Sequence, residues 1–339
     1  GPSALRRNGQ LHRDRRDGAR LFEKRRKELS SKTASESHNV GDPERRLPGS
    51  GSGVMSSRFF GQYLLEKGRI TSQQLFTALD SQKAVTAPMG ILALEKGLLT
   101  SDQIKHILDL QKKTNYRFGE IAVSAGLLTQ TQVDELLKHQ DLSHRVLLGE
   151  VLVAKGYLTL DALEKEFKEY DKEEEKLSSE LAAAFDKVRN KDLVKTFTDL
   201  MMIMFTRFAK QELKIEQCEI GKEKVRLFRW VFSQKVAGHN VEFNCLLSVP
   251  PKVMLHMAST MLDETVSAPD ELALDASKEF VNIANGNACA RLSTNGLDFT
   301  MEPPEVYETT SKPYAFQAKD VVCVHLVSPD AKLDVAFEF

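Results

Sequence analysis

The sequence contains no run of about 18 uninterrupted apolar residues, and no apolar segment of the signal-peptide type opens the chain. The first absence predicts that no segment spans a membrane. The second argues against export. We therefore expect a cytoplasmic protein.

Cysteine is scarce, and the Cys-x-x-Cys spacing of many zinc and redox sites is absent. The four cysteines lie in the last 122 residues, and the sequence indicates no histidine cluster beside them; they are Cys218, Cys245, Cys289 and Cys323. We therefore expect reduced, mostly buried thiols, with no metal and no disulfide framework.

The chain has almost no net charge, because 47 Lys and Arg face 48 Asp and Glu. This balance conceals an asymmetry along the chain. Residues 1–47 hold 13 basic and 7 acidic side chains, a balance of +6 that leaves −7 for the rest. With 339 residues, 41% of them hydrophobic, the chain is long enough for two or three domains with cores of their own.

The first 53 residues differ from the rest in composition. Residues 1–3 read GPS, which resembles the remnant of a removed affinity tag, and residues 48–53 read PGSGSG, which resembles an engineered flexible linker. Met55 follows in a start-like context. We infer that residues 4–47 are a peptide from a partner protein, joined to a chain that begins at Met55.

Within this peptide, Leu21, Phe22 and Leu29 fall on one helical stripe with basic side chains around it. Such a segment suits nucleic acid, an acidic membrane or a groove on a partner protein, and it also suits a solvated disordered tail. A tether favours the protein groove over nucleic acid, because it raises the effective concentration of a weakly binding peptide.

Four similar units of 24 residues follow, at 59–82, 88–111, 117–140 and 147–170. Their leading glycines are Gly61, Gly90, Gly119 and Gly149, separated by 29, 29 and 30 residues. In each unit an apolar run ends at a glycine suited to close a helix, and a threonine suited to cap the next helix comes three residues later. The repeats predict an all-α domain of helix-turn-helix units over residues 55–172.

These units resemble the N-terminal domain of type II secretion and pilus-assembly ATPases, in its cyclic-di-GMP-binding form the MshE N-terminal domain. The resemblance implies that Arg117, which opens the third unit, contacts guanine, and that the turns at Gly90, Gly119 and Gly149 approach the phosphates. The other units open with Phe59, Pro88 and Leu147 instead of arginine. The glycines can equally serve helix packing alone. No GxxxxGK[ST] motif occurs, so the ATPase activity does not carry over.

The acid-rich stretch from Glu164 to Lys176 leads into residues 173–188, which are expected to form an exposed helical connector. This acid-rich stretch is also a candidate surface for the basic peptide. After it, residues 189–339 read as a leading helix, two strands around 224–249, two helices around 250–264 and 271–292, and two closing strands from 320. This order predicts an α+β domain in which helices cover an antiparallel sheet.

One string in this region, DASKEFVNIANGNACARL, places Glu279 three residues before Asn282 on a helix, and Pro303 and Pro304 follow downstream. It resembles the signature of the chemotaxis phosphatases CheC, CheX and FliY, and with a single motif it is most similar to CheX. The resemblance implies that Asn282 orients the water that hydrolyses an aspartyl phosphate on a response regulator. It also implies that Glu279 pairs with the regulator's lysine, and that Mg²⁺ belongs to the regulator alone.

Our leading interpretation is a bacterial signalling adaptor that binds cyclic-di-GMP, a basic peptide or both, and forms homodimers through its CheX-like domain. An active response-regulator phosphatase is the alternative. A structural adaptor with neither activity is the third possibility, because Glu279 and Asn282 can also be plain surface residues of a helix.

Overall fold

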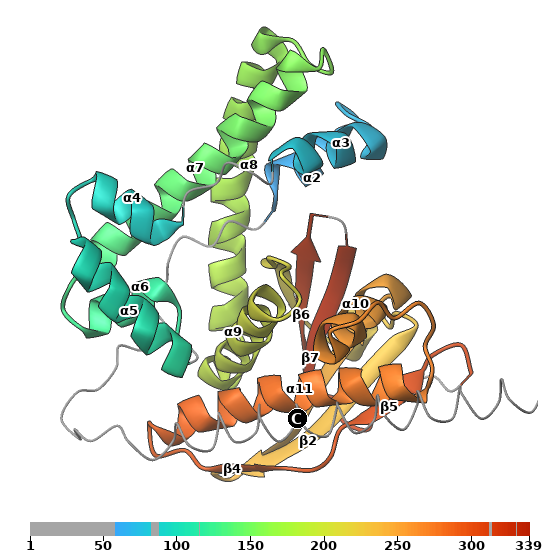
Figure 1. Ribbon diagram of the computed structural model, residues 1–339. Coiled ribbons are helices and arrows are strands. Elements are labelled where there is room, and N and C mark those ends of the chain that lie inside the picture. The colour runs from blue at the N-terminus through green and yellow to red at the C-terminus, as the bar shows by residue number, and fades with distance from the viewer. Residues whose placement is uncertain (1–57, 83–87, 115, 312–313, 330) are drawn as a thin grey trace, which may run out of the picture.

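We analysed a computed structural model that describes residues 58–82, 88–114, 116–311, 314–329 and 331–339 (Figure 1). The proposed peptide with Leu21, Phe22 and Leu29, and the proposed linker at 48–53, lie outside these residues. Among the described residues, no helix is both long enough and apolar enough to cross a membrane.

The N-terminal part of the described chain is helical, as the sequence predicts. Its helices are α2 (Phe60–Glu66), α3 (Ser72–Gln82), α4 (Met89–Glu95), α5 (Ser101–Lys113), α6 (Phe118–Ser124), α7 (Gln130–Ala154) and α8 (Leu160–Asp186). The turn glycines adopt φ of 65° to 69°, the left-handed region that closes a helix; they are Gly68, Gly97, Gly126 and Gly156. Thr100 accepts a hydrogen bond from the backbone N–H of Gln103, whose side chain accepts one from the backbone N–H of Thr100, so the expected capping box is present.

The structure departs from the expected arrangement in the later units. The second helix of the third unit and the first helix of the fourth are one continuous helix, α7. Residues 141–146 between them contain no glycine or proline, and Arg145 pairs with Asp141 one turn earlier at 3.0 Å. Because nothing in this spacer breaks a helix, the helix continues through it.

The units pair to form two small cores. The first and fourth units share one core that includes Tyr63, Leu64, Leu152 and Tyr170; we call this part lobe A. The second and third units share another core, which includes Ile107 and Leu136, and we call this part lobe B. Helix α7 runs from lobe B to lobe A, as Figure 1 shows.

Helix α8 continues through residue 172, where a domain boundary was expected. Its acidic side chains pair with basic residues in the first unit or just before it: Glu166 with Arg69 at 2.6 Å, and Glu173 with both Lys67 and Arg58. Much of the acidic charge that was considered as a surface for the basic peptide is therefore neutralised within lobe A. The last turns of α8 enter the core of the C-terminal domain, so the segment is only partly exposed.

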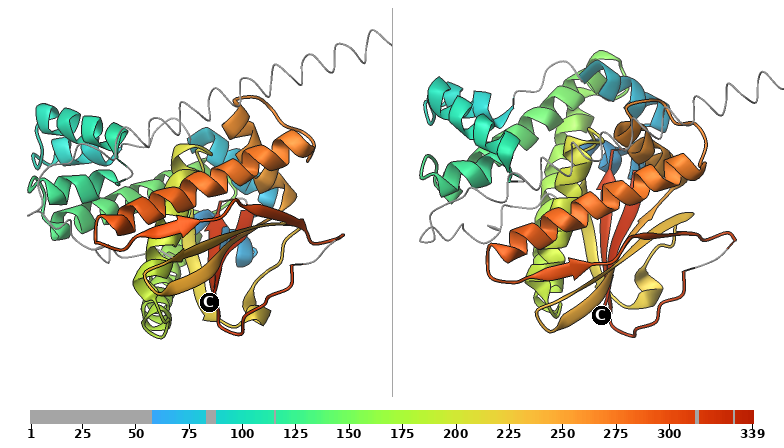
Figure 2. Two further views of the ribbon diagram at one scale, coloured as in Figure 1. Left: turned by 90° about the horizontal axis from the view of Figure 1, so that it is seen from below. Right: turned by 60° about the horizontal axis from the view of Figure 1, so that its bottom comes forward.

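The C-terminal domain is an α+β domain with one antiparallel sheet (Figure 2). Its elements are α9 (Lys191–Arg207), β1 (Lys214–Ile220), a 3₁₀ turn (Lys222–Lys224), β2 (Trp230–Gly238), β3 (Val241–Val249), α10 (Pro251–Leu262), α11 (Glu271–Ser293), β4 (Phe299–Met301), β5 (Glu305–Glu308), β6 (Val321–Ser328) and β7 (Ala331–Glu338). The strand order is β1-β6-β7-β3-β2-β4, and β5 also pairs with β2. Helices α9, α10 and α11 cover one face of the sheet and share its main core.

Three strands, β1, β4 and β5, were not expected from the sequence. Strand β4 has three residues and β5 four, too few for a visible alternation, and β1 carries a register shift between Ile215 and Gln217. The first expected strand also begins later, at Trp230. Before it, the backbone N–H groups of Arg226 and Phe228 donate to the side chains of Asp334 and Ser248 instead of to a neighbouring strand.

Both helical lobes contact the C-terminal domain through ion pairs. At lobe B, Arg291 of α11 lies 3.4 Å from Glu120 and 4.5 Å from the ring centre of Tyr116. At lobe A, Lys214 of β1 lies 3.1 Å from Asp141. The contacts of Arg291 place lobe B against the C-terminal end of α11, the helix that carries Glu279 and Asn282.

Candidate functional site

Glu279 and Asn282 lie on the middle turns of α11, and both side chains are half-buried. The helix starts at Asp270, whose side chain accepts a hydrogen bond from the N–H of Ala273. Its buried side chains, such as Phe280 and Val281, face the core, which fixes the rotation of the helix. The expected helix and the spacing of the motif on it are therefore present.

A side chain of strand β2, Gln234, holds the carboxamide of Asn282 from the side of the sheet. Gln234 is 1% exposed, and its Nε2 donates to Oδ1 of Asn282 at 2.8 Å. The same Nε2 donates to the backbone carbonyl of Glu302, also at 2.8 Å, in the segment that leads to Pro303 and Pro304. The prolines of the motif thus directly follow Glu302, whose backbone carbonyl holds Gln234, and Gln234 in turn holds Asn282.

A second buried amide continues this network inward. Asn285 is fully buried, and its Nδ2 donates to Oε1 of Gln234 at 2.9 Å. The thiol of Cys245 donates to Oδ1 of Asn285 at 3.5 Å. Burial raises the pKa of the Cys245 thiol well above its ordinary value, so the sulfur keeps the proton that it donates. The four side chains form one connected hydrogen-bond network, which we call the amide relay: Cys245, Asn285, Gln234 and Asn282.

Sequence reasoning missed Gln234 and Asn285. Asn285 lies three residues after Asn282, and Gln234 lies 48 residues before it, in a strand that is otherwise mostly buried. A polar residue in such a strand is the signal that was available, because a buried amide needs a partner. Nothing local to β2, however, identifies α11 as the helix that supplies that partner.

The residues expected to hold a cyclic dinucleotide lie in the helical lobes and are not gathered on one surface. Gly90 and Gly119 belong to lobe B, and Gly149 belongs to lobe A. A Cβ at Gly119 would lie 2.6 Å from Cγ1 of Val133, and one at Gly149 would lie 2.7 Å from Cδ2 of Leu163. Close packing between helices therefore accounts for these glycines without a ligand.

Arg117 precedes α6 and faces the C-terminal domain. Its guanidinium lies 3.6 Å from the carboxylate of Asp199 on α9. Burial raises the pKa of the Asp199 carboxyl, and the nearby charge of Arg117 opposes this shift. The side chain remains 49% exposed, so this contact between domains occupies one side of the guanidinium and leaves part of it open to solvent.

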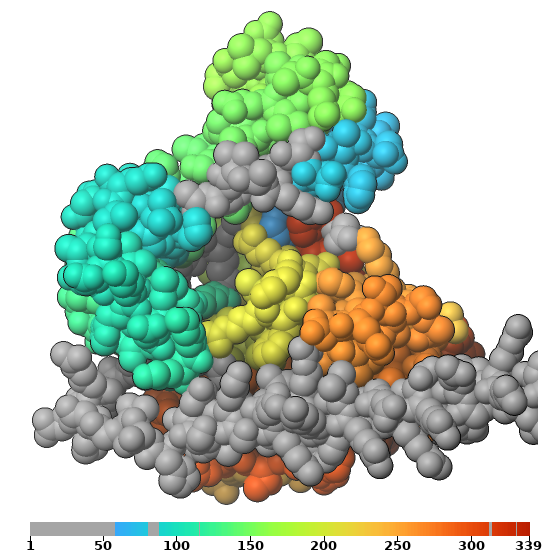
Figure 3. All heavy atoms as spheres, in the orientation of Figure 1, coloured from blue at the N-terminus to red at the C-terminus, as the bar shows by residue number. Residues whose placement is uncertain are grey.

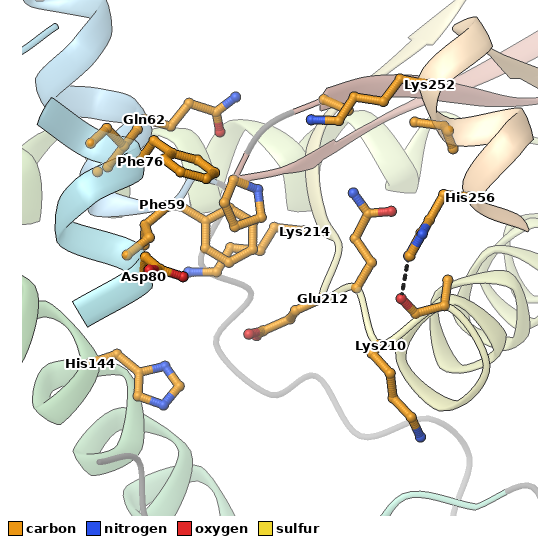
Figure 4. Close-up of a pocket in the computed structure, with 18 of the residues that line it drawn as sticks. Phe59, Gln62, Phe76, Asp80, His144, Lys210, Glu212, Lys214, Lys252 and His256 are labelled. Atoms are coloured by element: carbon orange, nitrogen blue, oxygen red, sulfur yellow. Dashed lines mark hydrogen bonds between the residues drawn. The ribbon is translucent and has the colours of Figure 1, made fainter. Parts of the chain in front are cut away.

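A cavity of about 940 Å³ lies between lobe A and the C-terminal domain. In Figure 3 it corresponds to the hollow where the blue, yellow, orange and red segments meet. Phe59 and Phe76 line its lobe A side, and Lys214 and His256 line the other side (Figure 4). Lys214 lies over the ring of Phe59 at 4.5 Å, and His256 hydrogen-bonds to the carbonyl of Ala209 at 2.6 Å.

The described residues contain one group with the composition of a metal site, formed by Cys323, His325 and Asp334, whose ligand atoms lie within 4.8 Å of one another. One histidine, His325, thus lies beside a cysteine, although no cluster of histidines was expected there. Arg226, however, donates to Asp334 from Nε at 2.8 Å. Burial works against ionisation of Asp334, yet hydrogen bonds from His325 and Arg226 hold the pKa of its carboxyl below the ordinary value. A guanidinium in this position disfavours a second cation, so the group is a buried ion-pair network.

All four cysteines are free and buried, as expected. Burial raises the pKa of the Cys289 thiol to about 11 and that of Cys218 to about 12. Both thiols stay protonated at neutral pH, so neither is a reactive thiolate.

The comparisons with known proteins fall on the C-terminal domain. A family model described as chemotaxis phosphatase CheX matches residues 234–326, a range that starts at Gln234 and contains Glu279 and Asn282. The C-terminal domain is therefore CheX-like. A search of curated proteins finds no match for the chain.

Solved structures similar to this chain include the chemotaxis protein CheX from Vibrio vulnificus, with 19% identity, coverage of 43% of this chain and 97% of that chain, and a TM-score of 0.39. The CheX–CheY–BeF₃–Mg²⁺ complex from Borrelia burgdorferi gives 21% identity, coverage of 43% and 96%, and a TM-score of 0.34. FliY from Thermotoga maritima gives 16% identity, coverage of 43% and 85%, and a TM-score of 0.35.

Proposed function

We propose that the CheX-like domain binds a response regulator phosphorylated on aspartate and accelerates loss of the phosphoryl group as inorganic phosphate. The observation that carries this proposal is the amide relay, which holds Asn282 in one orientation on α11, within the range that matches the chemotaxis phosphatase family. Response regulators act in the cytoplasm, so the proposal is consistent with the location expected from the sequence.

In this proposal Asn282 orients the attacking water. Gln234 donates to Oδ1 of Asn282, so the Nδ2 end of the amide is turned away from Gln234 and can hold the water by donating a hydrogen bond to its oxygen. A neutral amide positions the water without acting as a strong base. The regulator supplies the Mg²⁺ that offsets charge on the phosphoryl oxygens, and this chain needs no metal of its own.

Glu279, one turn before Asn282, is proposed to pair with the lysine of the regulator's active site. Replacing it with lysine reverses the charge at the contact. We expect Glu279→Lys to raise the half-saturating regulator concentration about tenfold or more. Replacing an attractive charge-assisted contact with a repulsive one should cost at least about 1.4 kcal/mol of binding free energy, which corresponds to one factor of ten.

The test follows decay of a panel of phosphorylated response regulators with the full chain, Glu279→Lys and Glu264→Lys. Glu264 is exposed and lies before α11, so Glu264→Lys controls for net charge. The proposal predicts faster decay with the wild-type and Glu264→Lys proteins, and a higher half-saturation with Glu279→Lys. If no regulator decays faster with the wild-type protein, the enzyme proposal fails and a binding role remains.

As a second proposal, which rests on the sequence resemblance alone, lobe B binds cyclic-di-GMP through Arg117 and the backbone near Gly90 and Gly119; Gly149 lies in lobe A, apart from this site. The half-exposed guanidinium of Arg117 supports this, because it retains one open side for stacking on a base. Calorimetry of the full chain and of Arg117→Ala with cyclic-di-GMP tests it. We expect the variant to bind about five- to a hundredfold more weakly, and equal affinities would contradict the proposal.

We also propose that residues 4–47 dock through Leu21, Phe22 and Leu29 on lobe A, beside the point where the described chain begins. Phe76, which is 66% exposed and lines the cavity, offers an apolar contact there. Replacing Leu21 and Phe22 with alanine in the detached peptide should weaken binding to the remaining chain far more than about 0.5 M salt does. The opposite result would indicate a loose electrostatic contact.

A homodimer through the CheX-like domain remains part of the proposal, because the sheet ends in strands whose outer edges favour pairing. Light scattering at about 20 μM, a concentration at which a functional dimer should persist, measures it directly. A monomer at that concentration would contradict it.

A further inference from the structure

The amide relay has a direction that the backbone determines. A backbone carbonyl can only accept hydrogen bonds, so the atom of Gln234 that lies 2.8 Å from the carbonyl oxygen of Glu302 has to be Nε2. The other end of the same amide, Oε1, then faces Asn285 and has to receive the Nδ2 donor at 2.9 Å. The orientation of Asn285 leaves its Oδ1 to accept from the protonated thiol of Cys245.

The same logic fixes Asn282. The second hydrogen on Nε2 of Gln234 points toward Asn282, and only an oxygen can accept it. Oδ1 of Asn282 therefore faces inward, and its Nδ2 is the end that is turned away from Gln234. Among the described residues, Nδ2 of Asn282 forms no hydrogen bond with another side chain or the backbone.

The placement of the relay sets it apart from ordinary core packing. Gln234 and Asn285 are 1% and 0% exposed, and they lie on elements whose other buried residues, such as Val236 and Ala284, belong to the main apolar core. Burying two carboxamides costs free energy that an apolar pair would not, and the hydrogen bonds only offset that cost. What the arrangement achieves is a single fixed orientation of the half-buried Asn282 amide at the surface.

From this geometry we infer that Gln234 is a positioning residue: it selects which end of the Asn282 amide faces a docked phosphoregulator, and Asn285 holds Gln234 in the orientation that does so. This inference rests on the proposed phosphatase function for its catalytic consequence. Its structural part, the orientation of Asn282, stands independently of any activity.

The test replaces Gln234 with methionine, which has a similar length and offers no N–H donor. We expect Gln234→Met to lower the maximal rate of phosphoregulator decay about ten- to a hundredfold, with a half-saturating concentration within about twofold of wild type. The matched control is Asn287→Leu, which removes another buried amide of α11; Asn287 donates to Sδ of Met204 and does not contact Asn282. We expect this control to retain the wild-type rate.

A double-variant cycle separates positioning from a general structural defect. Glu279→Lys is expected to change the half-saturating concentration and Gln234→Met the maximal rate, so the double variant should combine the maximal rate of Gln234→Met with the half-saturation of Glu279→Lys. A half-saturation far above that of Glu279→Lys would overturn the inference. So would a wild-type rate in Gln234→Met. If Gln234→Met does not fold, as judged by thermal unfolding, Gln234→Leu replaces it, since leucine also lacks the donor.

A measurement without activity makes failure of the inference distinguishable from failure of the proposed function. In ¹⁵N-labelled full chain, the side-chain NH₂ signals of Gln234 should exchange slowly with water, and those of Asn282 should exchange fast. Gln234→Met should shift the Asn282 signals and leave those of Asn287 in place. Unmoved Asn282 signals would overturn the inference even in an active enzyme, whereas an inactive wild type with shifted signals would overturn only the phosphatase proposal.

Discussion

For single residues, the amide relay separates what the short motif of Glu279 and Asn282 predicts from what it does not. The three-residue spacing of Glu279 and Asn282 was readable because an α-helix places such residues on one face. The pairing of Gln234 with Asn285 could not be predicted, because 51 residues separate them and only the folded sheet places β2 against α11. The catalytic candidates were thus accessible from local pattern, and their support was not.

Asp199 gives a residue-scale prediction about pH. Burial raises the pKa of this carboxyl in the folded protein, so the folded state holds the proton more tightly than the unfolded chain does. The stability that Asp199 contributes is therefore fully present below the ordinary carboxyl pKa and is lost as the pH rises through the folded value. We expect Asp199→Asn to flatten the pH dependence of the melting temperature over the range that starts at about pH 4, the ordinary carboxyl pKa, and extends upward.

Thermal unfolding of the wild-type and Asp199→Asn proteins across that range checks the prediction. Asp263→Asn is the matched control, because Asp263 is exposed at the end of α10. Parallel curves for wild type and Asp199→Asn would show that Arg117 compensates the burial of Asp199 fully.

At the scale of elements, helix starts and ends were the most predictable features. Threonine caps and left-handed glycines act within a few residues, so the sequence alone located the turns at Gly97 and Gly126. The continuity of α7 was harder to predict. A repeat pattern suggests a break between units, but the spacer between the third and fourth units contains no residue that breaks a helix. The short strands β4 and β5 depend on pairing with β2, which no local pattern encodes.

Gly119 gives an element-scale prediction. A methyl group there would meet Cγ1 of Val133 at 2.6 Å, and a buried β-branched side chain has little freedom to move aside. We expect Gly119→Ala to destabilise lobe B by about 1 to 3 kcal/mol.

Hydrogen exchange in α6 and α7 reports this local loss directly. The double variant Gly119→Ala with Val133→Ala is the control, because removing Cγ1 removes the clash. The two substitutions together should cost less than the sum of their separate effects. Additive losses would mean that α6 shifts away from α7 without strain.

At the scale of the whole molecule, the CheX-like domain does not present α11 in isolation. Arg291 of α11 contacts Glu120 and Tyr116, and Arg207 of α9 donates to the carbonyl of Thr114 at 2.9 Å. Both contacts attach lobe B beside the helix that carries Asn282. The sequence predicted the two kinds of domain, but no pattern within either one indicated that arginines of the second would bind the first.

Asn282 on α11 is proposed to orient the water that hydrolyses a regulator's aspartyl phosphate. The most direct test is single-turnover decay of a phosphorylated regulator under saturating full chain, compared between wild type and Asn282→Ala. We expect Asn282→Ala to bind the regulator with unchanged affinity, to stay folded with a somewhat lower melting temperature because Gln234 loses an acceptor, and to leave the decay at the regulator's intrinsic rate. An Asn282→Ala protein that accelerates decay as well as wild type does would contradict it.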